Sequence, residues 1–350
     1  LGVTYINNSS SNKEIATQNY DLEEAKIKTD ESVDENTANS KIAGDEEVSI
    51  GTYSDEASPE ITIEAIEPNT EPVRAVYEEE VENHTVFQIG LAGNQANSVP
   101  VTILIPNNII QNDFAGATPS QLDMYQQYAP QINEETLGFS EYHPYKGKFK
   151  TEGESLIHVL PKNHDYDLAG GAFGIYQTSL MDTFDEYKDI RFQNEDGSTV
   201  EFDQVGEPSK PLPLTKNKLM QNYYLFTSAE GKEYLTPNFG QTYKTITDAL
   251  EAMKGNPNGI YTTLIPRGIN FEIKEEDNLV RIHFTEPLDL ETLDPKVAMY
   301  LIEGILLTGA SFQQTIQMDN VIQSNWNGFD FTKPLPMPIG PNKMIYESIQ

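Results

Sequence analysis

The sequence contains no cysteine among its 350 residues. Disulfide bonds, metal sites built from thiolates and cysteine nucleophiles are therefore excluded. A chain of this length without cysteine suits export by a route that forms no disulfides, although cytosolic proteins can also lack cysteine.

Basic residues are few. The chain has 23 Lys and Arg against 55 Asp and Glu, which gives a formal net charge of −32 at pH 7. Such a charge repels phosphates, so it argues against nucleic acid as a partner, and it opposes adhesion to an anionic lipid surface. It favours solubility and leaves a cationic partner open.

Long apolar runs are also missing. The longest, residues 298–307, is interrupted by Glu303 and Gly304. A membrane-spanning helix needs about 20 consecutive apolar residues. We therefore expect no membrane span within these 350 residues.

The first part of the chain is polar and acidic. Residues 1–84 are rich in Asp, Glu, Asn, Ser and Thr and show no hydrophobic periodicity. Such a segment cannot bury enough apolar surface to offset the entropy that is lost on ordering. We therefore expect a disordered acidic tether over residues 1–84.

The remaining chain repeats a pair of landmarks. A Lys-Pro-Leu-Pro run occurs at residues 210–213 and again at 333–336. Upstream of each copy an acidic turn leads into an apolar, strand-like run, at residues 156–160 and 279–284. The same landmarks in the same order, about 120 residues apart, predict a duplicated domain.

Each copy is predicted to be a small α+β module. In the second copy we expect strands at residues 223–227, 232–237, 271–273, 279–284 and 315–318, a helix that Thr245 caps, and a helix at 297–312. In the first copy we expect strands at 86–91, 99–106, 156–160 and 190–192, and helices at 119–128 and 174–184. This βαββαβ-like order predicts a mostly antiparallel sheet with two helices on one face. The predicted modules are residues 85–214, which are degenerate, and residues 215–350.

A metal site is one interpretation of the histidines. His158, His164, Asp165 and Asp167 come nearest to a metal-ligand grouping, but their spacing matches no known ligand frame. A core or surface role is the favoured prediction for these residues, with a metal site as the alternative.

The acidic turns and the glycine-rich run offer no clearer chemistry. The turns at residues 152–154, 194–197 and 275–278 lack the alternating ligands of a calcium loop, so we expect ordinary turns. The run at residues 170–174 lacks the lysine of a P-loop and is expected to start a helix. No Gly-x-Ser-x-Gly elbow occurs. We therefore predict no enzymatic activity, no catalytic or metal-binding residues and no cofactor, and a hydrolase is the least favoured class.

Two apolar segments each allow two interpretations. Helix 298–312 places Leu301 and Ile305 on one face at helical spacing, which favours core packing over a partner groove. Glu303 falls on the other face, which we expect to be exposed. The stretch 325–331, with the single tryptophan Trp326, is either a terminal strand that pins the module or an exposed recognition loop.

The second copy carries a family resemblance. Residues 300–309, Tyr-Leu-Ile-Glu-Gly-Ile-Leu-Leu-Thr-Gly, follow an acidic turn and the hydrophobic strand 279–284. Residues 222–226, 245–253 and 328–338 extend the match. These segments resemble a sporulation and spore germination (GerM-type) domain. The resemblance covers roughly residues 215–345 and is weak over 85–214, where the Glu-Gly-x-x-Leu-Thr run is missing.

With the acidic segment, the duplication and the Lys-Pro-Leu-Pro ending, the chain most resembles the extracytoplasmic part of the anti-sigma-X factors of bacilli, the negative regulators of sigma-X activity. The resemblance implies a single-pass, membrane-anchored protein whose cytoplasmic segment holds an extracytoplasmic-function sigma factor inactive. It places these residues on the outer face of the cell membrane. It implies that the sigma factor binds a segment outside this sequence, that an N-terminal helix provides the anchor, and that an envelope protein or protease is a further partner. The alternative is a free-standing envelope or spore-assembly module.

Overall fold

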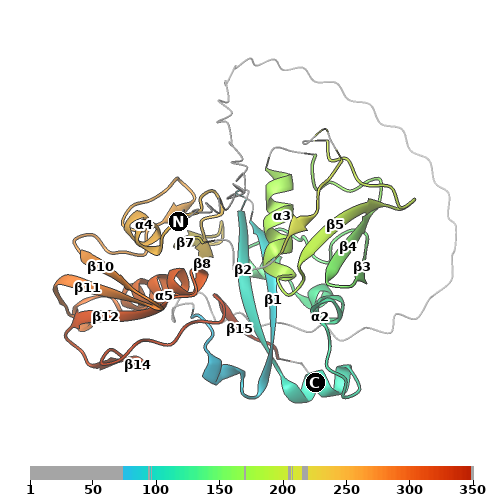
Figure 1. Cartoon of the computed structure of the whole chain (residues 1–350). Coiled ribbons are helices and arrows are strands. Elements are labelled where there is room, and N and C mark those ends of the chain that lie inside the picture. Colours follow the sequence, from blue (N-terminus) through green and yellow to red (C-terminus); the bar gives the residue numbers. More distant parts are fainter. Residues whose placement is uncertain are drawn as a thin grey trace, which may run out of the picture. The chain divides into compact units, whose positions relative to one another are not determined.

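The computed structural model of the chain describes residues 74–347, except 94, 96, 169–170, 204–205, 207 and 215–219 (Figure 1). Of the predicted tether over residues 1–84, residues 1–73 lie outside the described residues. Residues 74–84, which the sequence analysis assigns to the tether, are folded. The apolar residues Ala75, Val76 and Tyr77 are buried, and the short 3-10 helix η1 (Glu78–Val81) follows them.

The first module begins with an antiparallel hairpin of β1 (His84–Gly93) and β2 (Asn97–Pro106). After the hairpin come α1 (Asn107–Asp113), α2 (Gln121–Tyr128), η2 (Ala129–Gln131) and η3 (Glu135–Leu137). A second sheet contains β3 (Lys148–Glu152), β4 (Ser155–Leu160), β5 (Asp189–Asn194) and β6 (Leu212–Pro213), paired in that order. Helix α3 (Ala172–Thr183) connects β4 to the parallel strand β5.

The second module follows the same plan. It contains β7 (Tyr223–Thr227), β8 (Glu233–Pro237), α4 (Ile246–Ala252), β9 (Tyr261–Thr262), β10 (Phe271–Glu276), β11 (Leu279–Leu288), η5 (Leu290–Thr292), α5 (Pro295–Ser311) and β12 (Thr315–Val321). The chain then forms the small hairpin of β13 (Asn325–Trp326) and β14 (Phe329–Asp330), and β15 (Lys343–Ile345). Helix α5 connects β11 to the parallel strand β12, as α3 connects β4 to β5.

The α+β class predicted from the sequence is confirmed, with one refinement. Each module divides its strands between small sheets, of which one starts from the hairpin and the other contains the parallel pair. Helix α1, of seven residues, was not predicted. No helix in the described part of the chain is long and apolar enough to cross a membrane.

The helices begin where the sequence provides capping side chains. The Thr245 hydroxyl accepts a hydrogen bond from the Asp248 amide at the start of α4, as predicted. Helix α5 starts with Pro295 at its first turn, and the carboxylate of Asp294 accepts hydrogen bonds from the amides of Lys296 and Val297. These caps provide partners for amides that have none inside the helix.

The register of the sheets shows the duplication. In the first module Leu156 of β4 pairs with Ile190 of β5, and in the second Val280 of β11 pairs with Ile316 of β12. Strands β4 and β11 are therefore equivalent, as predicted. The two Lys-Pro-Leu-Pro runs are equivalent too, because Leu212 pairs with Ile190 and the Leu335 amide donates to the Ile316 carbonyl.

Each end of the described chain packs in the module that lies at the opposite end of the sequence. The predicted division between residues 214 and 215 did not anticipate this exchange. Strand β15 pairs in parallel with β2 of the first module, so Met344 and Tyr346 join the first core (Figure 1). Ala75 and Tyr77 join the second core. Each module is thus completed by a segment from the far end of the sequence.

Helix α5 is buried on all sides over residues 298–309. Ile305 and Leu306 lie in the second core, as the helical spacing predicted. A Cβ on Gly309 would lie 2.7 Å from Ile316 of β12, so this glycine permits a close approach of α5 to the sheet. The expectation that Glu303 is exposed is wrong, because residues 74–77 cover that face and the Glu303 side chain is 0% exposed.

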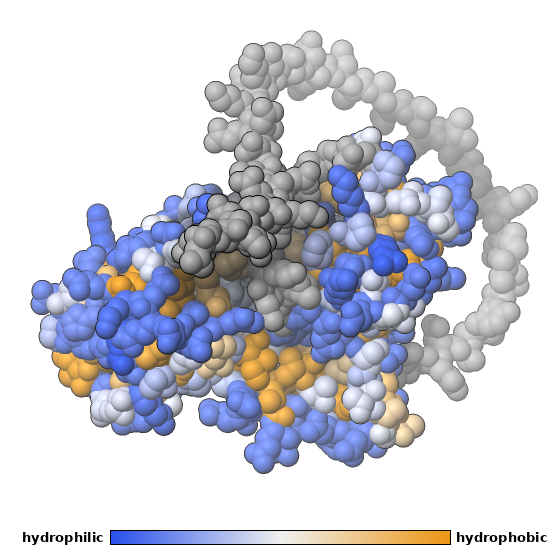
Figure 2. All heavy atoms as spheres, in the orientation of Figure 1, coloured by the Kyte–Doolittle hydropathy of each residue, from blue (hydrophilic) through white to orange (hydrophobic). Residues whose placement is uncertain are grey.

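The surface of the described part of the chain is mostly polar in the view of Figure 2. Hydrophilic residues cover most of the described part of the face in Figure 2, and hydrophobic residues gather in smaller areas, one of them over the β1–β2 hairpin.

Candidate functional site

Two equivalent threonines tie a helix to a strand in each module. The Gly90 amide of β1 donates to Thr183 Oγ1 over 3.1 Å, and the Tyr223 amide of β7 donates to Thr308 Oγ1 over 3.1 Å. Each hydroxyl in turn donates to the carbonyl four residues earlier in its helix, over 2.7 Å for Thr183 and 2.8 Å for Thr308. The two linkages make α3 equivalent to α5 and Gly90 equivalent to Tyr223.

Equivalent positions of both modules line one cleft, which we call the inter-module cleft. Gln88 and Gln221 precede Gly90 and Tyr223 by two residues. Pro100 and Pro237 pair with Gly90 and Tyr223 across the hairpins, and Asp182 and Leu307 precede the two threonines by one residue. All six residues line the cleft, whose volume is about 280 Å³. The cleft therefore lies where the same faces of the two modules meet.

One wall of the cleft comes from the segment that leads to β15. This closing segment, residues 337–341, contributes Met337, Ile339 and three neighbours to the lining. Met337 is 40% exposed and Ile339 is 38% exposed, so apolar side chains reach solvent at this wall. A Cβ on Gly340 would lie 2.4 Å from both Gln88 Nε2 and Thr102 Oγ1, which shows how closely the wall packs on the hairpin.

Asp182 is the only charged residue among the described residues that line the cleft. It is 9% exposed, and its Oδ2 accepts a hydrogen bond of 2.7 Å from Ser98 Oγ. Burial raises the pKa of the Tyr223 hydroxyl, and the nearby Asp182 charge raises it further. The described lining of the cleft is thus mostly apolar, with one carboxylate and three carboxamides, those of Gln88, Gln221 and Gln313.

The leading segment, residues 74–77, pairs with the closing segment. The Val76 amide donates to the Gly340 carbonyl over 2.8 Å, and the Ile339 amide donates to the Val76 carbonyl over 2.7 Å. The Lys343 amide donates to the Arg74 carbonyl over 2.8 Å. The wall of the cleft is therefore hydrogen-bonded to the backbone that connects the folded part to residues 1–73.

Glu303 of α5 holds the leading segment from the other side. Its Oε1 accepts from Arg74 Nε over 2.9 Å, and its Oε2 accepts from the Ala75 amide over 2.7 Å. Burial raises the pKa of Glu303 to about 7, although the Arg74 charge and both hydrogen bonds act to lower it. The Arg74 side chain is 29% exposed, so solvent reaches one side of this pair.

Asn342 joins the hairpins of the two modules. Its Nδ2 donates to the Pro100 carbonyl of β2 over 2.6 Å and to the Leu235 carbonyl of β8 over 2.7 Å. Its Oδ1 accepts from the Leu235 amide over 2.8 Å. The residue is fully buried and has a φ of 55°, a left-handed conformation that asparagine tolerates better than most residues.

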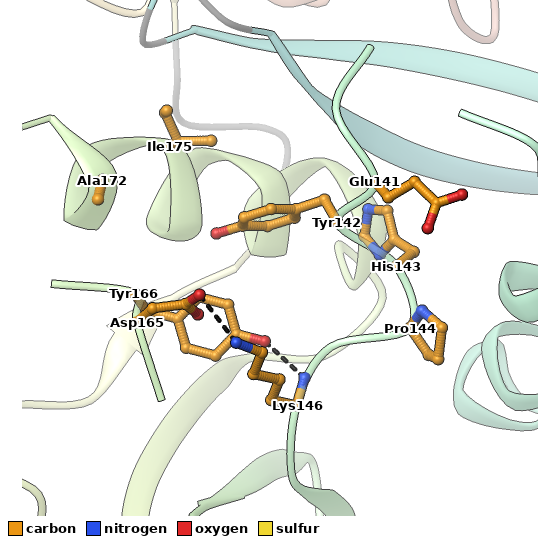
Figure 3. A pocket seen from close by; sticks show the side chains of 9 residues that line it. All are labelled: Glu141, Tyr142, His143, Pro144, Lys146, Asp165, Tyr166, Ala172 and Ile175. Atoms are coloured by element: carbon orange, nitrogen blue, oxygen red, sulfur yellow. Dashed lines mark hydrogen bonds and ion pairs between the residues drawn. The ribbon is translucent and has the colours of Figure 1, made fainter. Parts of the chain in front are cut away.

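A second pocket, of about 350 Å³, lies within the first module (Figure 3). Lys146 and Asp165 form an exposed ion pair of 2.8 Å at its edge, and the Lys146 amide donates to the Tyr166 hydroxyl over 2.6 Å. His143 contacts Tyr125 Oη through Nδ1 and the Gly90 carbonyl through Nε2, each over 3.0 Å. These groups are therefore occupied by partners within the fold.

The loop beside this pocket is held by a buried carboxylate that the sequence analysis missed. Glu134 Oε2 accepts from the amides of Tyr142 and His143, the latter over 2.9 Å. Burial raises the pKa of Glu134 to about 7 and lowers the pKa of His143 to about 4. The donors of these hydrogen bonds are backbone amides, so the Glu134 carboxylate positions the loop.

The residues weighed for a metal site are separated by their roles in the fold. His158 Nδ1 lies 2.5 Å from Tyr176 Oη, and its Nε2 lies 2.9 Å from the Lys146 carbonyl oxygen. Both ring nitrogens are therefore hydrogen-bonded, and neither is left for a metal. His164 lies 3.5 Å from Asp167, and Asp165 pairs with Lys146. Among the described residues no group of three or more such side chains is placed to hold a metal ion.

The acidic segments form turns. Residues 152–154 and 275–278 connect the strands of two antiparallel hairpins, and residues 194–197 close a turn through the Gly197 amide and the Asn194 carbonyl. Within the glycine-rich run at residues 170–174 the left-handed Gly171 directly precedes Ala172, where α3 begins, as expected.

The stretch around Trp326 combines the two predicted interpretations. Phe329 and Phe331 are buried in the second core, and Trp326 packs against it while partly exposed. Phe329 meets Tyr77 of the leading segment edge to face, with 5.9 Å between the ring centres. The hairpin therefore pins the module, mainly through its two phenylalanines.

No family model and no curated protein matches this chain. Among solved structures it is similar to the tandem GerMN domains of the sporulation protein GerM from Bacillus subtilis, with 16% sequence identity and a TM-score of 0.47. That similarity covers 74% of this chain and 99% of the other. The internal registers described above show the duplication within this chain independently of any relative.

Proposed function

We propose that this chain is the extracytoplasmic sensory region of a membrane-anchored anti-sigma factor that negatively regulates an extracytoplasmic-function sigma factor. The observation that carries the proposal is the backbone pairing of Val76 with Ile339 and Gly340. One partner of this pairing lines the cleft, and the other connects to residues 1–73. A change in the cleft wall therefore reaches the connection through two hydrogen bonds.

The proposed role is one of binding, without catalysis. In the pocket of the first module His143 is buried and uses both ring nitrogens, and Lys146 is paired with Asp165. A general base needs a nitrogen or carboxylate within reach of a substrate proton. The sigma factor would bind a cytoplasmic segment outside this sequence, and a membrane helix before the acidic segment would provide the anchor. This arrangement follows the resemblance found in the sequence.

The test uses the complete gene product in its own bacterium, with a reporter transcribed from promoters of the regulated sigma factor. Deleting the gene should raise reporter output. The variant Val76→Pro should also change output at equal protein level, because proline removes the amide that pairs with Gly340. Val297→Ala, on an exposed position of α5, is the matched control and should leave output unchanged.

The alternative from the sequence, an envelope or spore-assembly module, makes a different prediction. Such a module should form rings or larger assemblies of the purified chain in light scattering, and its deletion should leave sigma-dependent transcription unchanged. That pair of results would replace the regulatory proposal with the assembly function.

A further inference from the structure

The pocket of the first module contains a hydroxyl without a hydrogen-bond partner. Tyr142 lines this pocket, and its hydroxyl points between α3 and the pair of Lys146 and Asp165 (Figure 3). The hydroxyl oxygen is buried and forms no hydrogen bond with the described part of the chain. Burial raises the pKa of this group, so it stays protonated and can donate. Because a buried polar group without a partner is costly, a ligand oxygen beside it would gain a hydrogen bond without displacing one.

The walls of the pocket are held in place by the fold itself. Glu134 Oε2 accepts hydrogen bonds from the backbone of the loop that carries Tyr142. The Lys146 amide donates to Tyr166 Oη over 2.6 Å, and the Lys146 carbonyl oxygen lies 2.9 Å from His158 Nε2. A pocket that is formed in advance loses little conformational entropy when a ligand binds.

The charges of the lining favour a neutral ligand. Lys146 Nζ lies 2.8 Å from Asp165 Oδ2, and the two side chains are 52% and 53% exposed. A charged ligand would have to separate this pair, whereas a neutral ligand can add hydrogen bonds to its exposed side. The formal net charge of −32 also repels anions. Glu141 adds a second carboxylate to the lining.

The rest of the lining includes apolar surface. Pro144, Ala172 and Ile175 line the same pocket, whose volume of about 350 Å³ lies at the lower end of the range for small-molecule sites. The described lining therefore offers a phenol and an ammonium as donors and two carboxylates as acceptors, beside aliphatic groups. A hydroxyl group both donates and accepts hydrogen bonds. Adjacent hydroxyls on a rigid ring with an apolar C–H face match this combination.

We propose that the pocket of the first module binds a neutral pyranose sugar. One ring hydroxyl accepts from Tyr142 Oη, others bond to the Lys146–Asp165 pair, and the C–H face of the ring lies against Ile175 of α3. The pocket is formed within the first module, so the proposal is independent of the regulatory function proposed above.

A nuclear magnetic resonance titration of the 15N-labelled 350-residue chain tests the proposal with glucose, maltose, cellobiose and N,N′-diacetylchitobiose. At least one of these sugars should shift the amide signals of Tyr142 and Lys146 saturably, with 1:1 stoichiometry. Cyclohexanol, which has a single hydroxyl, and the anionic sugar glucuronate should bind at least tenfold more weakly. Tighter binding of a disaccharide than of glucose would identify the ligand as a unit of a longer glycan, and equal binding would identify it as a single sugar.

The variant Tyr142→Phe removes only the hydroxyl without a partner. It should weaken sugar binding at least fivefold and leave the midpoint of urea denaturation unchanged or higher, whereas a merely structural hydroxyl would lower that midpoint when removed. The matched control is Tyr243→Phe, which removes a hydroxyl that accepts from Asn222 in the second module and should leave sugar binding unchanged.

A second variant fills the pocket. Ala172→Phe at the start of α3 should abolish the saturable shifts while the circular dichroism spectrum is preserved. Saturable binding of none of the four sugars, sugar binding that survives both pocket variants, or equal binding of cyclohexanol or glucuronate would each overturn the proposal.

Discussion

Glu303 shows how a single side chain can differ from its sequence pattern. The carboxylate is fully buried and accepts hydrogen bonds from Arg74 and the Ala75 amide. Glu303→Ala should lower the free energy of unfolding by about 1–3 kcal/mol, because the buried Ala75 amide loses its acceptor while Arg74 can still reach water. The matched control is Glu286→Ala on an exposed position of β11, which should change it by less than about 0.5 kcal/mol. Urea denaturation of both variants measures the contrast, and equal effects would contradict it.

The raised pKa of Glu303 makes its contribution to stability depend on pH. Burial raises this pKa from an ordinary 4.5 to about 7, so between those values the folded chain binds more protons than the unfolded chain. The contribution of this pKa difference to the free energy of unfolding is complete below pH 4.5. It is lost as the pH rises through 7, and the loss is about 3 kcal/mol at most.

The variant Glu303→Gln isolates this effect, because it cannot titrate. Burial lowers the pKa values of His143 and His158 to about 4 and about 3, and these residues act in the opposite sense as the pH falls below their ordinary 6.5. Their effect cancels when variant and parent are compared at each pH. From pH 5 to pH 8 the Gln variant should become more stable relative to the parent. A constant difference across this range would exclude the raised pKa.

At the scale of elements, the two threonine linkages should contribute alike. Thr183→Val and Thr308→Val keep the shape of the side chain and remove the acceptor for a strand amide, Gly90 in the first module and Tyr223 in the second. Each should lower the free energy of unfolding by about 1–3 kcal/mol, measured by guanidinium denaturation. Thr332→Val, on an exposed turn, is the control. A loss in only one module would show that the linkages are not equivalent.

Helix α5 should behave as core. Leu306 is 1% exposed within the second core, so Leu306→Ala should cost about 2–5 kcal/mol. Val297 is 39% exposed at the start of the same helix, and Val297→Ala should cost far less. Denaturation midpoints that shift equally for the two variants would contradict the packing of α5.

How far the sequence predicts an element depends on where its partners lie. Helix α4, with its Thr245 cap, and the strands of the hairpins follow from local patterns. Strand β15 has three residues and pairs with β2, more than 200 positions earlier, so no local period announces it. The burial of Glu303 could not be predicted for the same reason, because its partner Arg74 lies 229 positions away. The candidate cleft was not predicted at all, since its lining meets only through the duplication.

At the scale of the whole molecule, Asn342 should control how the modules unfold together. Asn342→Gly keeps the left-handed backbone and removes three hydrogen bonds that join β2 to β8. We expect a lower melting temperature and a broader or divided transition in calorimetry. Asn327→Gly, at an exposed left-handed turn with φ of 48°, is the control and should leave the transition intact. Equal calorimetric traces for the two variants would show that the junction does not couple the modules.

The pairing of the leading and closing segments also orders events during biosynthesis. Val76 leaves the ribosome more than 260 residues before Gly340, its backbone partner. Until then the leading segment lacks its backbone partners in residues 339–343, and β2 lacks its neighbour β15. Closing a loop of this length costs entropy that only the finished contacts repay. Both modules therefore remain incomplete until almost all of the chain has been synthesised.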